Sequence, residues 1–180
     1  FLNIDNKKMS KSLGNFFTVR EVAEKYDLQV LRFFMLSAHY RSPINYSVEV
    51  IEQCKAALER MYTCRDNLQF ALSQAADGAS PADAALTEAL GQRKAKFIAA
   101  MDDDLNTADG VSAVFELVRD INSAEGQSRA SLEYAAHMFD ELTGVLGLVY
   151  NRKKEEIPAE ILEKAEQRQA ARKAKDFAAA

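Results

Sequence analysis

Apolar residues recur at steps of three and four along most of this chain, a spacing that places them on one face of an α-helix. Four such stretches follow one another: from Ser47 to about Asp77, from Ser80–Pro81 to about Met101, from about Thr107 to Asn122, and from about Ser131 to Gly147. Serine suits the start of a helix, and the glycine after the last stretch suits its close. Four amphipathic helices joined by short connections predict an antiparallel bundle.

The part of the chain before the first long helix carries shorter and more varied patterns. Residues 1–4 alternate between apolar and polar, which indicates the end of a strand whose partners we expect outside the chain. Thr18, with a glutamate three positions later, forms a capping box for a helix to about Tyr26, and Asp27 caps a second helix. The second helix is apolar on so many sides that we expect it to be buried nearly all round. Residues 37–45 mix polar, aromatic and proline residues, and we interpret them as a loop.

These patterns divide the chain into three segments. Residues 1–46 comprise a loop and two short helices, and residues 47–150 form the bundle. Residues 151–180 comprise a charged linker followed by one further helix. The linker carries charged residues without an apolar period, and Pro158 suits the first position of the helix after it. The predicted fold class is therefore mainly α.

Composition narrows the class of protein. Of 180 residues, 48% are hydrophobic and 28% are charged, which is the ordinary range for a globular protein. The formal net charge of -4 gives no overall attraction to nucleic acid, so any RNA contact must use local clusters of lysine and arginine. Such clusters occur at residues 7–11, 152–154 and 168–175.

The number and spacing of cysteines and the hydropathy of the chain indicate in which cellular compartment the protein lies. Cys54 and Cys64 match neither a zinc-binding spacing nor a secreted disulfide framework, and we interpret both as core residues of a reduced, cytoplasmic protein. No apolar run reaches the length of a membrane span and no secretory leader is present, so we expect no membrane partner. The chain begins at Phe1 without methionine and stops within a helix-favouring segment, so we expect it to be a fragment of a longer protein.

Three consecutive aspartates, Asp102 to Asp104, form the acidic cluster that could suggest a metal site. Magnesium is usually held by one or two carboxylates together with substrate phosphates. The cluster directly precedes the third predicted bundle helix, where negative charge stabilises the positive end of the helix dipole. We therefore interpret it as helix capping, with Asn106 or Thr107 as the cap residue, and predict no metal site in this chain.

The segment Lys8 to Asn15 carries the residues best suited to chemistry. Lys8 and Lys11 flank a short stretch with two serine hydroxyls, and Gly14 permits backbone conformations closed to other residues. Lysine is a compact charge on a flexible stem, and a serine hydroxyl both donates and accepts hydrogen bonds. Such a segment can bend and bring cations to a phosphate, although its content alone is more typical of an exposed polar turn.

The order of these residues resembles the second signature loop, KMSKS, of the class I aminoacyl-tRNA synthetases. The match is specific to that class but not to one amino acid. Further segments resemble the cysteinyl-tRNA synthetase family: residues 16–20, 31–37, 39–47 and 101–107. The resemblance covers almost the whole chain and is weakest between residues 77 and 92.

The resemblance implies that cysteine is activated with ATP, in the presence of Mg2+, to cysteinyl-adenylate and is then transferred to tRNA(Cys). Lys8 and Lys11 would be the catalytic residues, because they would neutralise charge on the leaving pyrophosphate. The residues that would bind ATP are Lys8, Met9, Ser10, Lys11 and Ser12. The family's other nucleotide-binding signature and its Zn2+ ligands lie outside this chain. We therefore expect the chain alone to show no aminoacylation and to bind no stoichiometric zinc.

The resemblance also assigns roles to the three segments. Residues 1–46 would be the KMSKS loop and a stem-contact region at the end of the catalytic part, and residues 47–150 an anticodon-binding (DALR) bundle. Residues 151–180 would begin a truncated anticodon-recognition domain. The residues that would contact tRNA are His39, Tyr40, Arg41, Arg172, Lys173 and Phe177. The alternatives are a surface connection between helices for the first three and a solvated charged face for the others.

Two other functions stay open from the sequence. The helices could be a free-standing tRNA-binding module in which the signature loop is unused, or the chain could belong to a related ligase that joins cysteine to an amino-sugar. The long bundle and the basic terminal helix argue against the amino-sugar ligase, because a small acceptor requires no anticodon-facing surface. For the cysteinyl-tRNA synthetase reading we expect a cytoplasmic monomer.

Overall fold

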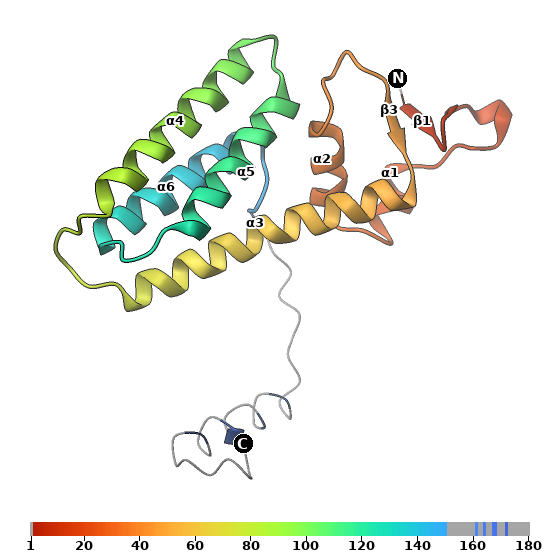
Figure 1. The fold of residues 1–180 in the computed structure, drawn as a ribbon. Helices are drawn as coiled ribbons and strands as arrows, with labels where there is room; N and C mark the ends of the chain where they lie inside the picture. Colours follow the sequence, from red (N-terminus) through yellow and green to blue (C-terminus); the bar gives the residue numbers. More distant parts are fainter. Residues whose placement is uncertain (1, 151–160, 162–163, 165–166, 169–171, 173–180) are drawn as a thin grey trace. The chain divides into compact units, whose positions relative to one another are not determined.

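The computed structural model describes residues 2–150 together with residues 161, 164, 167, 168 and 172. The chain divides into two compact units, Phe1–Tyr150 and Asn151–Ala180. The description that follows concerns the first unit (Figure 1).

Helices dominate the part of the chain that the structure describes, which confirms the mainly α fold. In chain order the elements are β1 (Leu2–Ile4), β2 (Lys7–Lys8), the 3-10 helix η1 (Lys11–Leu13), α1 (Val19–Ala23), α2 (Leu28–Leu36), β3 (Ile44–Tyr46), α3 (Val48–Gln74), α4 (Asp83–Asp102), α5 (Thr107–Ser123) and α6 (Arg129–Val145). The last four helices form the predicted bundle.

The strand predicted at the start of the chain is present, but its expected lack of partners is wrong. β1 pairs antiparallel with β2 and parallel with β3, so the order in the sheet is β2-β1-β3. Asp5 and Asn6 connect β1 to β2 with positive φ angles of 47° and 64°, as a two-residue hairpin turn requires. β3 lies partly within residues 37–45, so the loop predicted there ends earlier than expected.

The two short helices begin where the sequence predicts. Thr18 and Glu21 form the predicted capping box of α1, and the Asp27 side chain accepts the Gln29 N–H at the start of α2. α1 ends at Ala23, before the predicted end at Tyr26.

The expectation that α2 is buried nearly all round is wrong. Leu28 and Met35 are 50% and 53% exposed, whereas Phe33 and Phe34 are buried. The buried face packs against α3 and also contacts α1 and α5. Met35 instead faces an open hollow that is described below.

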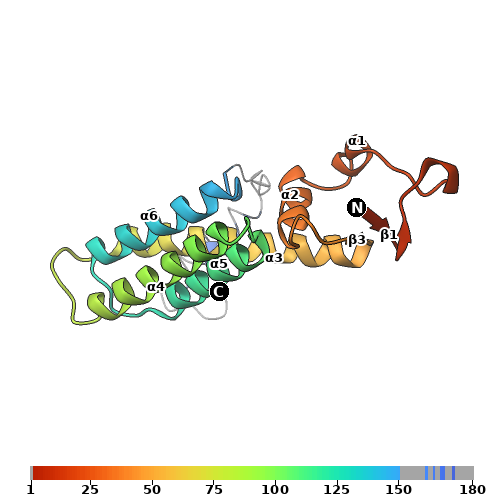
Figure 2. The ribbon, with the colours of Figure 1, turned by 90° about the horizontal axis from the view of Figure 1, so that it is seen from above.

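α3 belongs to both halves of the first unit. It contacts α2 in the N-terminal half, and it contacts α5 and α6 in the bundle, whose other close pairs are α4 with α5, α4 with α6 and α5 with α6. Figures 1 and 2 show α4, α5 and α6 alongside one part of α3, while β1, β3, α1 and α2 gather along the other part. The core of the bundle is apolar, and its largest fully buried side chains include Met61, Leu90, Leu117 and Phe139.

Two bundle helices start at residues other than those predicted. α4 begins at Asp83 rather than at Ser80–Pro81, because residues 81 and 82 form a turn that the Asp83 N–H closes on Ser80 O at 3.1 Å. The Ser80 hydroxyl accepts the Ala82 N–H at 3.2 Å and donates to Gly126 O at 2.6 Å. α6 begins at Arg129, two residues earlier than predicted, with Ser128 as the cap.

The predicted close of α6 at Gly147 is confirmed. Gly147 has a φ of 64°, its N–H donates to Gly144 O at 3.0 Å, and the Leu148 N–H donates to Thr143 O at 2.9 Å. This pair of hydrogen bonds is the Schellman motif, which satisfies the last carbonyls of a helix.

Both cysteines are core residues, as predicted. Cys54 and Cys64 are buried and unpaired with each other. Burial raises the pKa of the Cys54 thiol and raises that of Cys64 to about 12, so both thiols stay neutral. Among the described residues no group of three or more His, Cys, Asp or Glu side chains could hold a metal ion. In the same part of the chain no helix is both long and apolar enough to cross a membrane.

Candidate functional site

The segment Lys8–Asn15, called the signature loop from here on, begins at the end of β2, an edge strand of the small sheet. Its first residue ends β2, and the Met9 N–H donates to Leu2 O at 3.1 Å, which continues the pairing with β1. The chain then turns through η1, and Gly14 ends this turn with a φ of 66° and an N–H bond to Lys11 O. Gly14 therefore provides the left-handed conformation that side chains disfavour.

The side chain of Asn15 closes the signature loop from within. Its Oδ1 accepts the Ser10 N–H at 2.9 Å, and its Nδ2 donates to Lys8 O at 3.2 Å. The Asn15 amide group thus fixes the backbone at Lys8 and at Ser10, the residue before Lys11. The sequence places Asn15 at the end of the motif, but its role in closing the loop was not predicted. The available signal was an asparagine directly after a loop glycine, since asparagine side chains often bond to nearby backbone in turns.

The polar side chains of the signature loop are exposed or half-buried. Ser10 Oγ and Ser12 Oγ lie 2.7 Å apart and share one hydrogen bond. Lys11 Nζ lies 5.4 Å from the centroid of the Phe16 ring, a cation–π contact that leaves its N–H groups able to bind an anion. Among the described residues neither Lys8 nor Lys11 forms an ion pair. The loop therefore presents two amines and two hydroxyls that can bind a phosphate group.

A second group of predicted site residues lies in the connection between α2 and β3. The rings of His39 and Tyr40 are stacked, with centroids 4.8 Å apart and an interplanar angle of 25°. The guanidinium carbon of Arg41 lies 5.4 Å from the centroid of the Tyr40 ring. We call these three planar side chains the aromatic–arginine ladder.

Asp104 binds this ladder from the corner between α4 and α5. Its Oδ1 accepts the Tyr40 hydroxyl at 2.7 Å and Arg41 Nη2 at 3.2 Å, and its Oδ2 lies 3.0 Å from Arg41 Nε. His39 Nε2 lies 3.9 Å from the same carboxylate. The hydrogen bond to Asp104 raises the pKa of the Tyr40 hydroxyl, because it holds the proton on the phenol.

The three aspartates lie directly before α5, as predicted, but Asp104 also binds the ladder, a contact that the sequence did not indicate. Asn106 is the cap of α5, as one of the two predicted alternatives had it, and its Oδ1 accepts the Asp109 N–H at 3.2 Å. Asp104 and Leu105 precede it with positive φ angles of 56° and 54°. This turn directs the Asp104 carboxylate to the ladder, which lies far away in the sequence.

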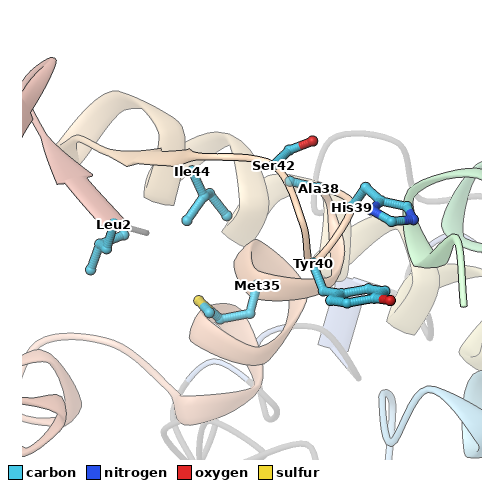
Figure 3. Close-up of a pocket in the computed structure, with 7 residues that line it drawn as sticks. All are labelled: Leu2, Met35, Ala38, His39, Tyr40, Ser42 and Ile44. Atoms are coloured by element: carbon cyan, nitrogen blue, oxygen red, sulfur yellow. The ribbon is translucent and has the colours of Figure 1, made fainter.

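A shallow hollow of about 160 Å³ adjoins the ladder. It is lined by Leu2, Met35, Ala38, His39, Tyr40, Ser42 and Ile44. Figure 3 shows Leu2, Met35 and Ile44 toward one end of the hollow and the rings of His39 and Tyr40 toward the other. The hollow is thus apolar at the sheet and aromatic at the ladder.

The site residues predicted near the C-terminus belong to the second unit. Arg172 is an exposed helical residue, and Lys173 and Phe177 lie outside the described residues. The structure therefore brings together the signature-loop residues in one place and His39, Tyr40 and Arg41 in another, and it leaves the role of the C-terminal group as a prediction.

Two family models match this chain. Residues 1–56 match the model described as tRNA synthetases class I (C) catalytic domain. Residues 96–151 match the model described as DALR domain. The region that matches the catalytic-domain model contains the signature loop and the ladder, and the region that matches the DALR model contains Asp104.

Curated relatives named cysteine–tRNA ligase match along the whole length of the chain. One from Caldicellulosiruptor saccharolyticus is 52% identical over 98% of this chain and 38% of its own length. Others from Clostridioides difficile and Lachnospira eligens are each 46% identical, over 98% and 100% of this chain and 39% of their own lengths. The chain thus spans less than half the length of the relatives it matches.

A solved structure shares the fold. It is the ternary complex of Agrobacterium radiobacter LeuRS with tRNA and LeuAMS, which matches 83% of this chain and 22% of its own chain with a TM-score of 0.64. At 19% sequence identity this similarity concerns the fold alone.

Proposed function

Because the chain belongs to the cysteine–tRNA ligase family of class I aminoacyl-tRNA synthetases, we propose that it is the part of such a ligase that carries the ATP-phosphate loop and the tRNA-binding helices. The whole ligase would activate cysteine with ATP and transfer it to tRNA(Cys). The observation that carries the proposal is the signature loop, in which Lys8 and Lys11 form no ion pair with any residue that the structure describes, on a backbone that Asn15 holds in place.

In the first step the cysteine carboxylate attacks the α-phosphorus of ATP, and pyrophosphate leaves with the bonding electron pair. Negative charge on the leaving pyrophosphate grows during this step, so a cation that meets it stabilises the transition state more than the bound substrate. Lys11 and Lys8 supply this charge. In the hydrogen-bonded Ser10–Ser12 pair, the hydroxyl that accepts keeps its own proton free to donate to a phosphate oxygen. A tRNA ribose hydroxyl then attacks the adenylate carbonyl, and AMP leaves.

Metal ions enter this proposal only from outside the described residues. Mg2+ would accompany ATP as part of the substrate. The donor set here does not fit Zn2+, because Cys54 and Cys64 are buried, neutral thiols and no cluster of candidate ligands is present in the described part of the chain. We propose that any zinc of the whole ligase is bound by residues that precede this segment.

We propose tRNA contacts at two groups of residues, one in the ladder and one near the C-terminus. His39, Tyr40 and Arg41 offer ring faces and a guanidinium group, which stack on bases or bind phosphate. Arg172, Lys173 and Phe177 stay a prediction for the anticodon end, as do the monomeric state and the cytoplasmic location. The relatives match the bundle as well as the loop, which supports the ligase over a free-standing tRNA-binding module and over a ligase for amino-sugars.

The test is cysteine-dependent ATP–pyrophosphate exchange by the full-length ligase that carries this segment. Lys11→Ala should lower the exchange rate by about 10²–10³, the usual effect of removing one positioned group that stabilises transition-state charge. The matched control is Lys7→Ala, an exposed lysine of the same sheet edge outside the signature loop. A near-normal exchange rate for Lys11→Ala, or an equal loss for both variants, would refute the catalytic role.

A further inference from the structure

The aromatic–arginine ladder has the features of a site that binds RNA. Its three planar groups come from successive residues, and Tyr40 is 59% exposed as a whole residue. Unstacked RNA bases bind to exposed aromatic faces, and a guanidinium group binds a phosphate through parallel hydrogen bonds. The ladder can therefore bind a base and the adjoining phosphate together.

In this structure the guanidinium group already binds an anion from the same chain. Asp104 Oδ1 accepts a hydrogen bond from Arg41 Nη2 at 3.2 Å, and Asp104 Oδ2 lies 3.0 Å from Arg41 Nε, whose N–H donates to the Tyr40 hydroxyl at 2.8 Å. An oxygen of a phosphate would accept from the guanidinium group in the same place. The Tyr40 hydroxyl donates to the same carboxylate at 2.7 Å. The carboxylate thus occupies the position on the ladder that is best suited to a phosphate group.

The contact is built by the fold, yet it is weak enough to exchange. Two successive non-glycine residues, Asp104 and Leu105, hold the left-handed conformation that brings the carboxylate to the ladder. The paired side chains are nevertheless 68% exposed at Arg41 and 45% exposed at Asp104. Ion pairs between exposed side chains contribute little to stability, so an incoming phosphate can replace the carboxylate at small cost.

We infer that Asp104 is an internal occupant of an RNA phosphate site, and that RNA binds the ladder by displacing its carboxylate from Arg41. This inference rests on the proposed function, because it takes the ladder as an RNA contact. It goes further because it assigns Asp104 the role of a competitor, whose carboxylate opposes RNA binding at Arg41. Removal of its charge should strengthen RNA binding.

The experiment measures binding of a fluorescently labelled tRNA(Cys) transcript to the 180-residue chain by anisotropy over a series of salt concentrations. Asp104→Asn keeps the size of the side chain and an oxygen for the Tyr40 hydroxyl but removes the charge. We expect it to bind the transcript about fivefold more tightly, the effect of removing one competing ion pair of about 1 kcal/mol. Asp103→Asn, the exposed aspartate next to it, changes the net charge equally and should have a smaller effect.

Arg41→Ala separates the inference from the function on which it rests. We expect it to weaken binding about tenfold and to lower the salt slope by about one, as loss of one phosphate contact does. In the Arg41→Ala background, Asp104→Asn should no longer strengthen binding, because the site for which it competes is gone. Asp104→Ser is a second variant in case Asp104→Asn disturbs the corner, and thermal unfolding checks both.

Each result decides one of the two claims. Unchanged binding by Arg41→Ala would overturn the ladder as an RNA site, and with it the inference. Weaker binding by Arg41→Ala, with no gain for Asp104→Asn or Asp104→Ser beyond that of Asp103→Asn, would overturn the inference alone. A loss of binding by folded Asp104 variants would show that the carboxylate orders the ladder for RNA rather than competing with it.

Discussion

The signature loop and the helical bundle are stabilised by different kinds of interaction. The loop has exposed lysines, a glycine in the left-handed conformation and an asparagine amide that joins its two ends. The bundle surrounds side chains such as Leu117 and Phe139, which are 0% exposed. Water can replace the hydrogen bonds of the loop at small cost, whereas it cannot replace close packing. The loop can therefore change conformation during a reaction while the bundle stays folded.

The largest effect on stability should come from emptying the bundle core. Phe139→Ala should lower the free energy of unfolding by about 3–5 kcal/mol, because it removes a fully buried ring and leaves a cavity. Chemical unfolding of the chain followed by circular dichroism measures this difference. Phe70→Ala is the matched control, since Phe70 is 70% exposed on α3, and we expect it to change stability by less than about 0.5 kcal/mol. Equal effects of the two variants would contradict the assigned core.

Breaking the Asn15 amide contact should slow the chemistry without unfolding the protein. Asn15→Ala removes the bonds to Ser10 N–H and Lys8 O, each of which contributes about 1 kcal/mol to the order of the loop. In the full-length ligase we expect kcat for ATP–pyrophosphate exchange to fall about tenfold, with a smaller change in KM for ATP and an unchanged melting temperature.

Asn67→Ala, an exposed asparagine on α3, is the control for this substitution. Its exchange rate should equal that of the unaltered ligase. If Asn15→Ala raised KM with kcat unchanged, Asn15 would serve ATP binding rather than the positioning of the lysines.

A smaller effect should follow from removing the cap of α1. Thr18 accepts the Glu21 N–H and is part of the capping box, so Thr18→Ala should destabilise this short helix by about 1 kcal/mol. Hydrogen exchange of the α1 amides should become faster, while the amides of α5 and α6 should stay protected. Thr63→Ala within α3 is the control. Loss of protection throughout the bundle would show that the two regions unfold together.

The smallest effect should appear as a dependence of stability on pH. The Asp83 carboxylate accepts the Ser128 N–H at 2.9 Å and the Ser80 N–H at 2.8 Å, and these bonds hold its pKa below the usual value. A lowered pKa stabilises the fold above the unfolded value of about 3.9, and this stabilisation is lost as the pH falls through the folded pKa. The melting temperature of Asp83→Asn should therefore lie below that of the unaltered chain at neutral pH, and the difference should shrink in acid. A difference that is constant with pH would exclude the carboxylate charge as the cause.

Much of the fold was predictable because its signals are local. The capping residues Thr18, Asp27, Ser47 and Asn106 lie next to the helices that they begin, and apolar spacing marks the core faces. The signature loop was also predictable in position, since the order of its residues is contiguous. What it contacts in the whole ligase stays a prediction.

The missed features depend on contacts between distant parts of the chain. Arg41 and Asp104 are 63 positions apart, and neither has a neighbour in the sequence that indicates the pairing. β2 has two lysines rather than an apolar pattern, so its place in the sheet depends on the hairpin turn before it. The Ser80 hydroxyl oxygen accepts the Ala82 N–H, as a cap residue does, but the same hydroxyl also donates to the distant carbonyl of Gly126. In each case a tertiary partner adds to the local preference or overrides it.

The shared helix α3 has a mechanical consequence. Its 27 residues make a rod of about 40 Å, one end of which directly follows β3 of the sheet that carries the signature loop while the other end is part of the bundle. A stiff lever of this length converts a tilt of about 5° at one end into a displacement of about 3.5 Å at the other. A small tilt of the bundle would thus move Lys8 and Lys11 of the signature loop by more than the length of a hydrogen bond.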